Sequence, residues 1–212
     1  MMEPMDMERR QAVSEIFLIL AELYKYPHES FYLELASKKV DEELKKLFAA
    51  ANYKVIPLPD FSSRAGEFSQ LKKSYSSCFL GLVQPYAMPV ESVYKVWTTD
   101  PTAQLNFANS KGYVMGDSAL HINHLIEHFH LEIPEEYRTM PDHLTILLEL
   151  YSYIQAERNA GEAYQFIKDH FNWLDEFKKV LCQLSNNHFY LYVLEILQGV
   201  IAEEKLYYQN FN

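Results

Sequence analysis

Five apolar side chains recur at intervals of three and four residues within residues 139–154, whose sequence is TMPDHLTILLELYSYI. They are Leu144, Leu147, Leu148, Tyr151 and Ile154. Such intervals place side chains on one side of an α-helix, which must then pack against other parts of the chain. Thr139 and Asp142 have the spacing of a capping box, so we expect the helix to begin near Met140 and Asp142 to serve the cap. His143 would lie on the first turn without a capping role.

Helical spacing of apolar residues continues along most of the chain, and no stretch shows the alternation of a β-strand. Prolines predict loops at residues 52–61 and 81–92. The sequence therefore predicts an all-α protein, a single compact bundle of about nine or ten helices that forms one domain over residues 1–212. The predicted helices span residues 6–26, 31–35, 44–51, 68–79, 101–111, 117–129, 140–154, 163–171, 173–184 and 189–207.

The 212 residues carry a formal net charge of −10, and lysine and arginine form no cluster. This balance opposes contact with nucleic acid, so no nucleic acid partner is expected. It favours a cationic partner, although the acidity could equally serve solubility alone. Only 6 glycines are present, which nearly excludes a glycine-rich phosphate loop. The 16 tyrosines and 13 phenylalanines leave enough rings beyond the core to line an apolar groove.

Arg9 and Arg10 precede an apolar run at residues 16–21, which superficially resembles a twin-arginine export signal. Glutamates flank this short run and no small-residue cleavage site follows, so we predict a helix of the folded protein instead. No run approaches the roughly 20 apolar residues that span a bilayer, and stable membrane insertion is not expected. Cys78 and Cys182 lie in no CxxC motif and should be buried, as in a reducing compartment. We therefore expect a cytoplasmic protein.

Four histidines lie close together: His121, His124 and His128 on one face of the predicted helix 117–129, and His130 beyond it. Two imidazoles on a helix can bind zinc or iron, so a helical metal-binding protein is one alternative. The first and third of these histidines lie about 10 Å apart along the axis, and no matching cysteine or carboxylate is evident. We expect a solvated histidine face and no metal site.

The neighbouring Asp142 and His143 could be read as a catalytic base with its orienting carboxylate. Neighbours on a helix point about 100° apart, so Asp142 is poorly placed to hold the ring of His143. No serine or cysteine lies in a nucleophile motif such as G-x-S-x-G. We therefore expect no catalytic residue, no enzyme activity and no cofactor.

The segment 85–94 is an apolar loop that also contains an acid. Its members are Tyr86, Met88, Val90 and Tyr94, together with Glu91. One interpretation is a loop that covers the core. The other is a concave apolar site rimmed by acid, which suits a peptide that is apolar along its length and basic at one end.

Three stretches carry a family resemblance: YSSCFLG at residues 75–81, PVESVY at residues 89–94, and MPDHL at residues 140–144. Two weaker ones are FIKDH at residues 166–170, followed by Trp173, and LAELY before Pro27. Together they resemble the TorD/DmsD/NarJ family of redox-enzyme maturation chaperones. One departure is Thr139, which stands where the family usually has a glutamate.

The resemblance implies an all-helical cytoplasmic chaperone without catalytic activity. It would bind the twin-arginine signal peptide or a terminal segment of a molybdopterin oxidoreductase catalytic subunit, and hold it for cofactor insertion before export. Asp142 and Glu91 would meet the peptide's arginines, and His143 a peptide carbonyl. A monomer, a dimer and a generic helical adaptor all remain open. The implied peptide-binding residues, with Glu91 added from the loop, are Tyr24, Tyr75, Phe79, Pro89, Glu91, Tyr94, Asp142 and His143.

Overall fold

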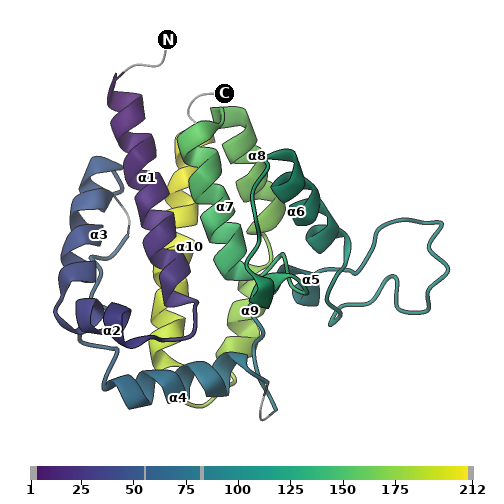
Figure 1. Cartoon of the computed structure of the whole chain (residues 1–212), viewed down its shortest axis with the longest axis horizontal. Helices are drawn as coiled ribbons and strands as arrows, with labels where there is room; N and C mark the ends of the chain where they lie inside the picture. Colours follow the sequence, from purple (N-terminus) through teal and green to yellow (C-terminus); the bar gives the residue numbers. More distant parts are fainter. Residues whose placement is uncertain (1–3, 55, 82–83, 210–212) are drawn as a thin grey trace.

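The computed structural model describes residues 4–54, 56–81 and 84–209 (Figure 1). Ten α-helices and one short 3-10 helix occur in these ranges, which confirms the predicted all-α class. They are α1 (Pro4–Leu23), α2 (Glu29–Ala36), α3 (Lys39–Ala50), α4 (Phe68–Phe79), α5 (Glu91–Tyr94), α6 (Asp117–His128), η1 (Glu135–Tyr137), α7 (Leu144–Glu157), α8 (Ala160–His170), α9 (Leu174–Leu181) and α10 (His188–Gln209).

The centre of the bundle is formed by α1, α7 and α10, with α3 packed on α1 and α8 packed on α7 (Figure 1). The apolar stripe predicted from the sequence is buried there, since Leu147, Leu148 and Tyr151 have no exposed surface. The rings of Tyr151 and Phe17 of α1 lie 4.3 Å apart between centroids. Removing this apolar surface from water is the main term that stabilises the bundle, at about 25 cal/mol per Å².

Arg9 and Arg10 lie inside α1, as predicted. The guanidinium of Arg9 pairs with the fully buried carboxylate of Glu204 in α10, which also accepts hydrogen bonds from two tyrosine hydroxyls. Arg10 donates from Nε to the backbone carbonyl of Gln155 over 2.8 Å, near the end of α7. These arginines therefore join α1 to the helices beside it. None of the described helices is long and apolar enough to cross a bilayer.

Between α5 and α6 the chain leaves the bundle as a projecting loop, residues 95–116 (Figure 1). The helix predicted over residues 101–111 is wrong, because this segment forms turns. Backbone hydrogen bonds join the two limbs of the loop. In addition, the Asp100 carboxylate accepts a hydrogen bond from the N–H of Thr102 over 2.8 Å. Such a local bond offers the backbone an alternative to a helix.

The two cysteines differ in their surroundings. Cys78 is buried in α4, as predicted, and burial raises the pKa of its thiol to about 11. Cys182 is exposed, and the prediction of a buried residue is wrong for it. It is the C-cap residue of α9, where the helix ends before the turn to α10.

Candidate functional site

The two segments that carried most of the family resemblance lie against each other. The N–H of Leu144 donates to the carbonyl of Pro89 over 2.8 Å, and the N–H of Glu91 donates to the carbonyl of Asp142 over 3.1 Å. The carboxylate of Asp142 also accepts a hydrogen bond from the N–H of Ser92 over 2.7 Å. The turn that opens α5 is thus fastened to the start of α7, and we call this contact the α5–α7 junction (residues 89–92 with 142–144).

Helix α7 begins four residues later than predicted, at Leu144, and its N-cap is His143. The Nδ1 atom of His143 accepts a hydrogen bond from the N–H of Thr145 over 3.2 Å. The prediction that Asp142 caps the helix is therefore wrong. His143, for which no capping role was predicted, is the residue that caps it. Pro141 disfavours helical geometry at Met140, which delays the helix. Burial lowers the pKa of His143 to about 3, which keeps the ring neutral and able to accept.

The predicted aromatic residues form part of the core rather than an open groove. Tyr24 of α1 and the α4 residues Tyr75 and Phe79 are buried together with Tyr190 of α10. The hydroxyl of Tyr75 donates to the carbonyl of Tyr24 over 3.2 Å, and the rings of Phe79 and Tyr190 lie 4.6 Å apart. Burial raises the pKa of the Tyr75 hydroxyl. These rings hold α4 across one end of the bundle.

All eight predicted peptide-binding residues are buried, including Pro89 and Tyr94. The ring of Tyr94 stacks on that of Trp173, with 5.2 Å between centroids. The expectation that these side chains line an open hollow is therefore wrong for this conformation. The structure does bring Pro89, Glu91, Asp142 and His143 together, and it places the Tyr24, Tyr75 and Phe79 cluster in the packing of α4.

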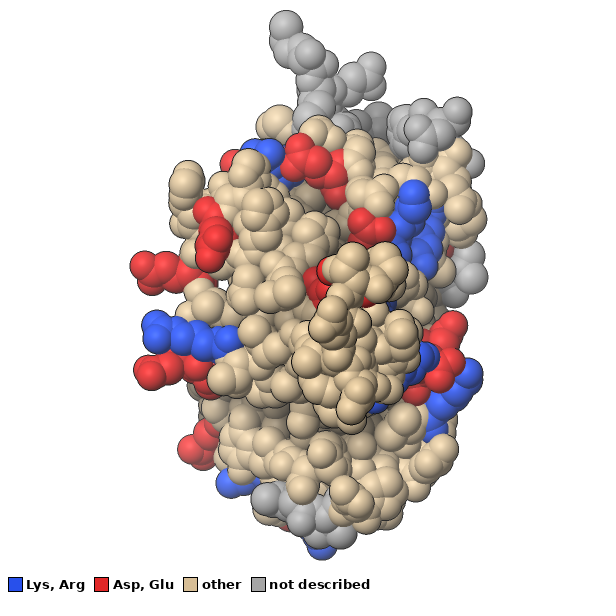
Figure 2. All heavy atoms as spheres, turned by 90° about the vertical axis from the view of Figure 1, so that its right-hand side faces the viewer, with Lys and Arg blue, Asp and Glu red and all other residues tan. Residues whose placement is uncertain are grey.

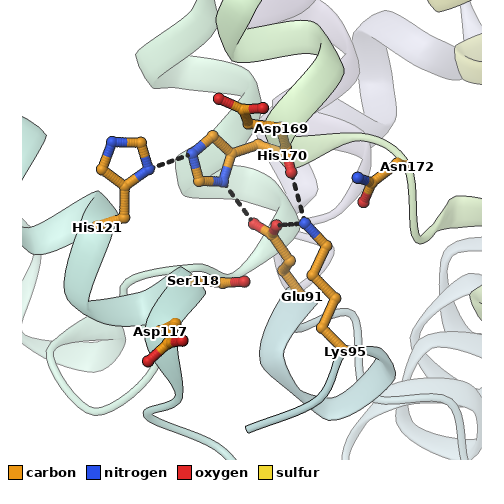
Figure 3. A pocket seen from close by; sticks show the side chains of 8 residues that line it. All are labelled: Glu91, Lys95, Asp117, Ser118, His121, Asp169, His170 and Asn172. Atoms are coloured by element: carbon orange, nitrogen blue, oxygen red, sulfur yellow. Dashed lines mark hydrogen bonds and ion pairs between the residues drawn. The ribbon is translucent and has the colours of Figure 1, made fainter. Parts of the chain in front are cut away.

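Glu91 connects the α5–α7 junction to a surface cavity, as Figure 3 shows. Its side chain has no exposed surface, yet both carboxylate oxygens have partners. Oε2 lies 2.8 Å from Nδ1 of His170, and Oε1 accepts a hydrogen bond from Nζ of Lys95 over 2.5 Å. The Nε2 atom of His170 lies 2.9 Å from Nδ1 of His121. A chain of polar contacts thus links α5, α8 and α6.

The cavity beside these residues has a volume of about 330 Å³. Three carboxylates border it, and of the lysines and arginines that the structure describes only Lys95 does. In the last turn of α8, the backbone carbonyl of Asp169 accepts a hydrogen bond from Lys95 beside the cavity. Such carbonyls carry partial negative charge, so the cavity suits a cation. Its lining residues are Glu91, Lys95, Asp117, Ser118, His121, Asp169, His170 and Asn172.

Only Glu91 of these lining residues was predicted to bind a ligand. The resemblance at residues 166–170 pointed to His170, but nothing near it indicated a partner. The predicted solvated face is confirmed for His124 and His128, which are exposed. His121 is also exposed, but its ring contacts His170, and the partial loss of solvent around the ring together with that neighbour lowers its pKa. Among the described residues, no group of three or more potential ligands could hold a metal ion.

A loop with several exposed apolar side chains adjoins the cavity. The loop 95–116 starts at one lining residue, Lys95, and ends just before another, Asp117. Figure 2 looks onto this side of the molecule and shows, below a carboxylate near the centre of the face, a broad area without lysine, arginine, aspartate or glutamate. Val96, Tyr113 and Val114 of the loop are exposed by 38%, 45% and 39%. Exposed apolar side chains on a loop beside an acidic cavity can contribute to a protein-interaction surface.

Comparisons with known proteins give a family and a fold. Residues 34–189 match the model of the nitrate reductase delta subunit family. The crystal structure of a proposed redox enzyme maturation protein from Archaeoglobus fulgidus is similar, with a TM-score of 0.55 and 16% identity over 87% of this chain and 93% of that one. At this identity the likeness concerns the fold alone. No curated protein sequence matches the chain significantly.

Proposed function

The chain belongs to the nitrate reductase delta subunit family, and we propose that it is a cytoplasmic chaperone for a molybdopterin oxidoreductase. It would bind the signal peptide or a terminal segment of the catalytic subunit and hold that subunit for cofactor insertion before export. The observation that carries this proposal is the family match over residues 34–189. The fold shared with a proposed redox enzyme maturation protein adds support for the architecture.

The surface chemistry supports a client that is basic at one point and apolar beside it. The cavity offers carboxylates and the backbone carbonyl of Asp169 to a cation, and the loop 95–116 offers exposed apolar side chains. A signal peptide with arginines ahead of an apolar run has this combination. Apolar contacts would supply most of the affinity, while the charges would supply orientation and a faster association rate.

The eight buried residues would act on client binding indirectly, by holding the structure around the cavity. Asp142, His143 and Glu91 fasten the α5–α7 junction and so fix one wall of the cavity. The side chain of Pro89 would reach a client only if this turn separated from α7, and that of Tyr94 only if its ring left Trp173. Tyr24, Tyr75 and Phe79 would need α4 to move. A direct contact of these residues with a client therefore requires an opened conformation.

The proposal is tested by titrating the full chain with a labelled synthetic peptide of a molybdoenzyme amino-terminal segment, and by co-expression with the apo catalytic subunit. We expect saturable binding that weakens as salt rises, and a complex that can be isolated before cofactor insertion. A scrambled peptide of the same composition is the control. Equal binding of the two peptides, together with no isolated complex, would contradict the proposal. Co-purification of unrelated proteins only would favour the generic helical adaptor.

A further inference from the structure

We propose that the acidic cavity is a cation-binding subsite which Lys95 occupies from within the chain, and that an arginine of the client replaces Lys95 there. This inference rests on the proposed chaperone function and names a subsite for it. The juxtaposition that carries it is an ammonium group seated between the buried Glu91 carboxylate and the carboxyl end of α8 (Figure 3).

The place held by Lys95 has ligands for a cation. Nζ donates one hydrogen bond to Oε1 of Glu91 and another to the backbone carbonyl of Asp169, each at a distance of 2.5 Å. The carboxylates of Asp169 and Asp117 also border the cavity. The lining has three carboxylates, one ammonium and the two imidazoles of His121 and His170, so it stays net negative with at most one imidazole protonated. That excess of negative charge favours the binding of a further cation, or the replacement of the Lys95 ammonium by a cation that forms more hydrogen bonds.

Lys95 can leave this place without undoing the fold. Its side chain is 25% exposed, whereas that of Glu91 is fully buried. Lys95 follows the last residue of α5 and begins the projecting loop, so its flexible stem is tied to no long helix. The other oxygen of Glu91 keeps its contact with Nδ1 of His170 when the ammonium departs. Glu91 would therefore not become a buried carboxylate without any partner, which is the costly outcome.

An arginine is a better occupant than a lysine. A guanidinium carries five N–H donors in a planar fork, against three donors around the single nitrogen of an ammonium. It can therefore donate at once to the Glu91 carboxylate and to the Asp169 carbonyl, and still reach a second carboxylate. The residues beside such an arginine would lie along the loop at Val96, Tyr113 and Val114, which are exposed and apolar. The expected client segment has an arginine flanked by apolar residues.

The test uses the full chain and two labelled peptides, the amino-terminal segment of a molybdoenzyme and the same peptide with citrulline for each arginine. Citrulline keeps the shape of arginine and removes its charge. We expect Lys95→Met to bind the arginine peptide about three- to tenfold more tightly than wild type, because the internal competitor is gone. Its affinity for the citrulline peptide should change little. Lys95→Arg, which keeps a competing cation, should show no gain.

A complementary variant removes a carboxylate from the rim. Asp169→Asn should bind the arginine peptide about three- to tenfold more weakly, with the citrulline peptide nearly unaffected. Glu176→Gln on α9, an exposed carboxylate outside the lining, is the matched control and should leave both affinities unchanged. Equal changes for both peptides would overturn the inference.

A measurement on the wild type avoids any risk that a variant fails to fold. Lys95 should react faster with an amine-specific reagent when the arginine peptide is bound, as read by mass spectrometry of the 95-containing fragment. The citrulline peptide should not have this effect. Unchanged or slower labelling would overturn the inference. If wild type binds neither peptide and Lys95→Met binds neither, the proposed function itself fails, whereas peptide binding that ignores both the charge and Lys95 refutes the subsite alone.

Discussion

The carboxylate of Asp142 accepts a hydrogen bond from the backbone N–H of Ser92 over 2.7 Å, although 50 residues separate the two in sequence. Both belong to segments that resemble the binding motifs of the family. In the folded chain they bind each other, and Asp142 has no exposed surface. Asp142 therefore joins α5 to α7 in this structure.

Asp142→Ala should lower the free energy of unfolding by about 1–3 kcal/mol, because it leaves a buried N–H without an acceptor. Asp142→Asn should cost less, since its carbonyl oxygen can still accept from Ser92. Chemical denaturation measures both variants. Asp175→Ala, which removes an exposed aspartate from the first turn of α9, is the control. An Asp142→Ala variant no less stable than this control would show that the fastening contributes little.

Stability should fall in mild acid because of His143. Burial lowers its pKa from 6.5 to about 3, so the unfolded chain binds a proton in this interval that the folded chain excludes. The contribution of the neutral His143 ring to the free energy of unfolding is complete above pH 6.5. It is lost as pH falls toward 3, at up to about 1.4 kcal/mol per pH unit. His143→Asn keeps a capping side chain that cannot be protonated, and should show a flatter profile between pH 7 and pH 5 in urea denaturation.

His124→Gln removes an exposed imidazole and tests whether the loss of any histidine flattens the profile. Parallel pH profiles for wild type and His143→Asn would contradict the assignment to the N-cap ring.

Phe79→Ala should lower the free energy of unfolding by about 3–5 kcal/mol, because it leaves a cavity among the rings of Tyr24, Tyr75, Phe177 and Tyr190. Phe79→Leu should cost much less, since it keeps an apolar side chain in this space. Thermal and chemical denaturation measure these losses. Client binding measured on the folded fraction of each variant then separates packing from contact. A loss of affinity beyond the unfolded fraction would indicate that Phe79 touches the client.

Arg9→Met should destabilise the protein by about 3–5 kcal/mol, because it leaves the fully buried carboxylate of Glu204 without its cation. Burial raises the pKa of Glu204, so this variant should recover stability as pH falls and the carboxyl group becomes protonated. The double change Arg9→Met with Glu204→Gln should be more stable than Arg9→Met alone. Denaturation of the three proteins at two pH values measures this coupling. Additive losses would indicate that the two side chains act independently.

The positions of most helices followed from the spacing of apolar residues. The prediction for residues 68–79 coincides with α4, and the stripe of α7 is buried as expected. The errors occur where another part of the chain or a local turn competes with that spacing. The carboxylate of Asp142 was predicted to cap its own helix, but it accepts a hydrogen bond from the backbone N–H of Ser92 instead. Residues 101–111 were assigned to a helix, but hydrogen bonds between the limbs of the loop hold them in turns.

The candidate site was only partly predictable for the same reason. The sequence indicated Glu91 because it is an acid within an apolar loop. No local sequence feature indicated the partners of Lys95 and His170. Their contacts join positions 79 and 74 residues apart, between Glu91 and His170 and between Lys95 and Asp169. Such distances in sequence are closed by the packing of α5, α6 and α8.

The amino-acid sequence by itself determined that the chain is helical, that the apolar stripe of α7 faces the core, and to which family the chain belongs, because helical period and short motifs are local properties. Only the tertiary structure decided that the motif residues are buried against each other and that the open acidic cavity lies beside them at Lys95 and Asp169. Which side chains meet depends on the angles and offsets at which helices pack, and these arise from contacts spread over the whole bundle.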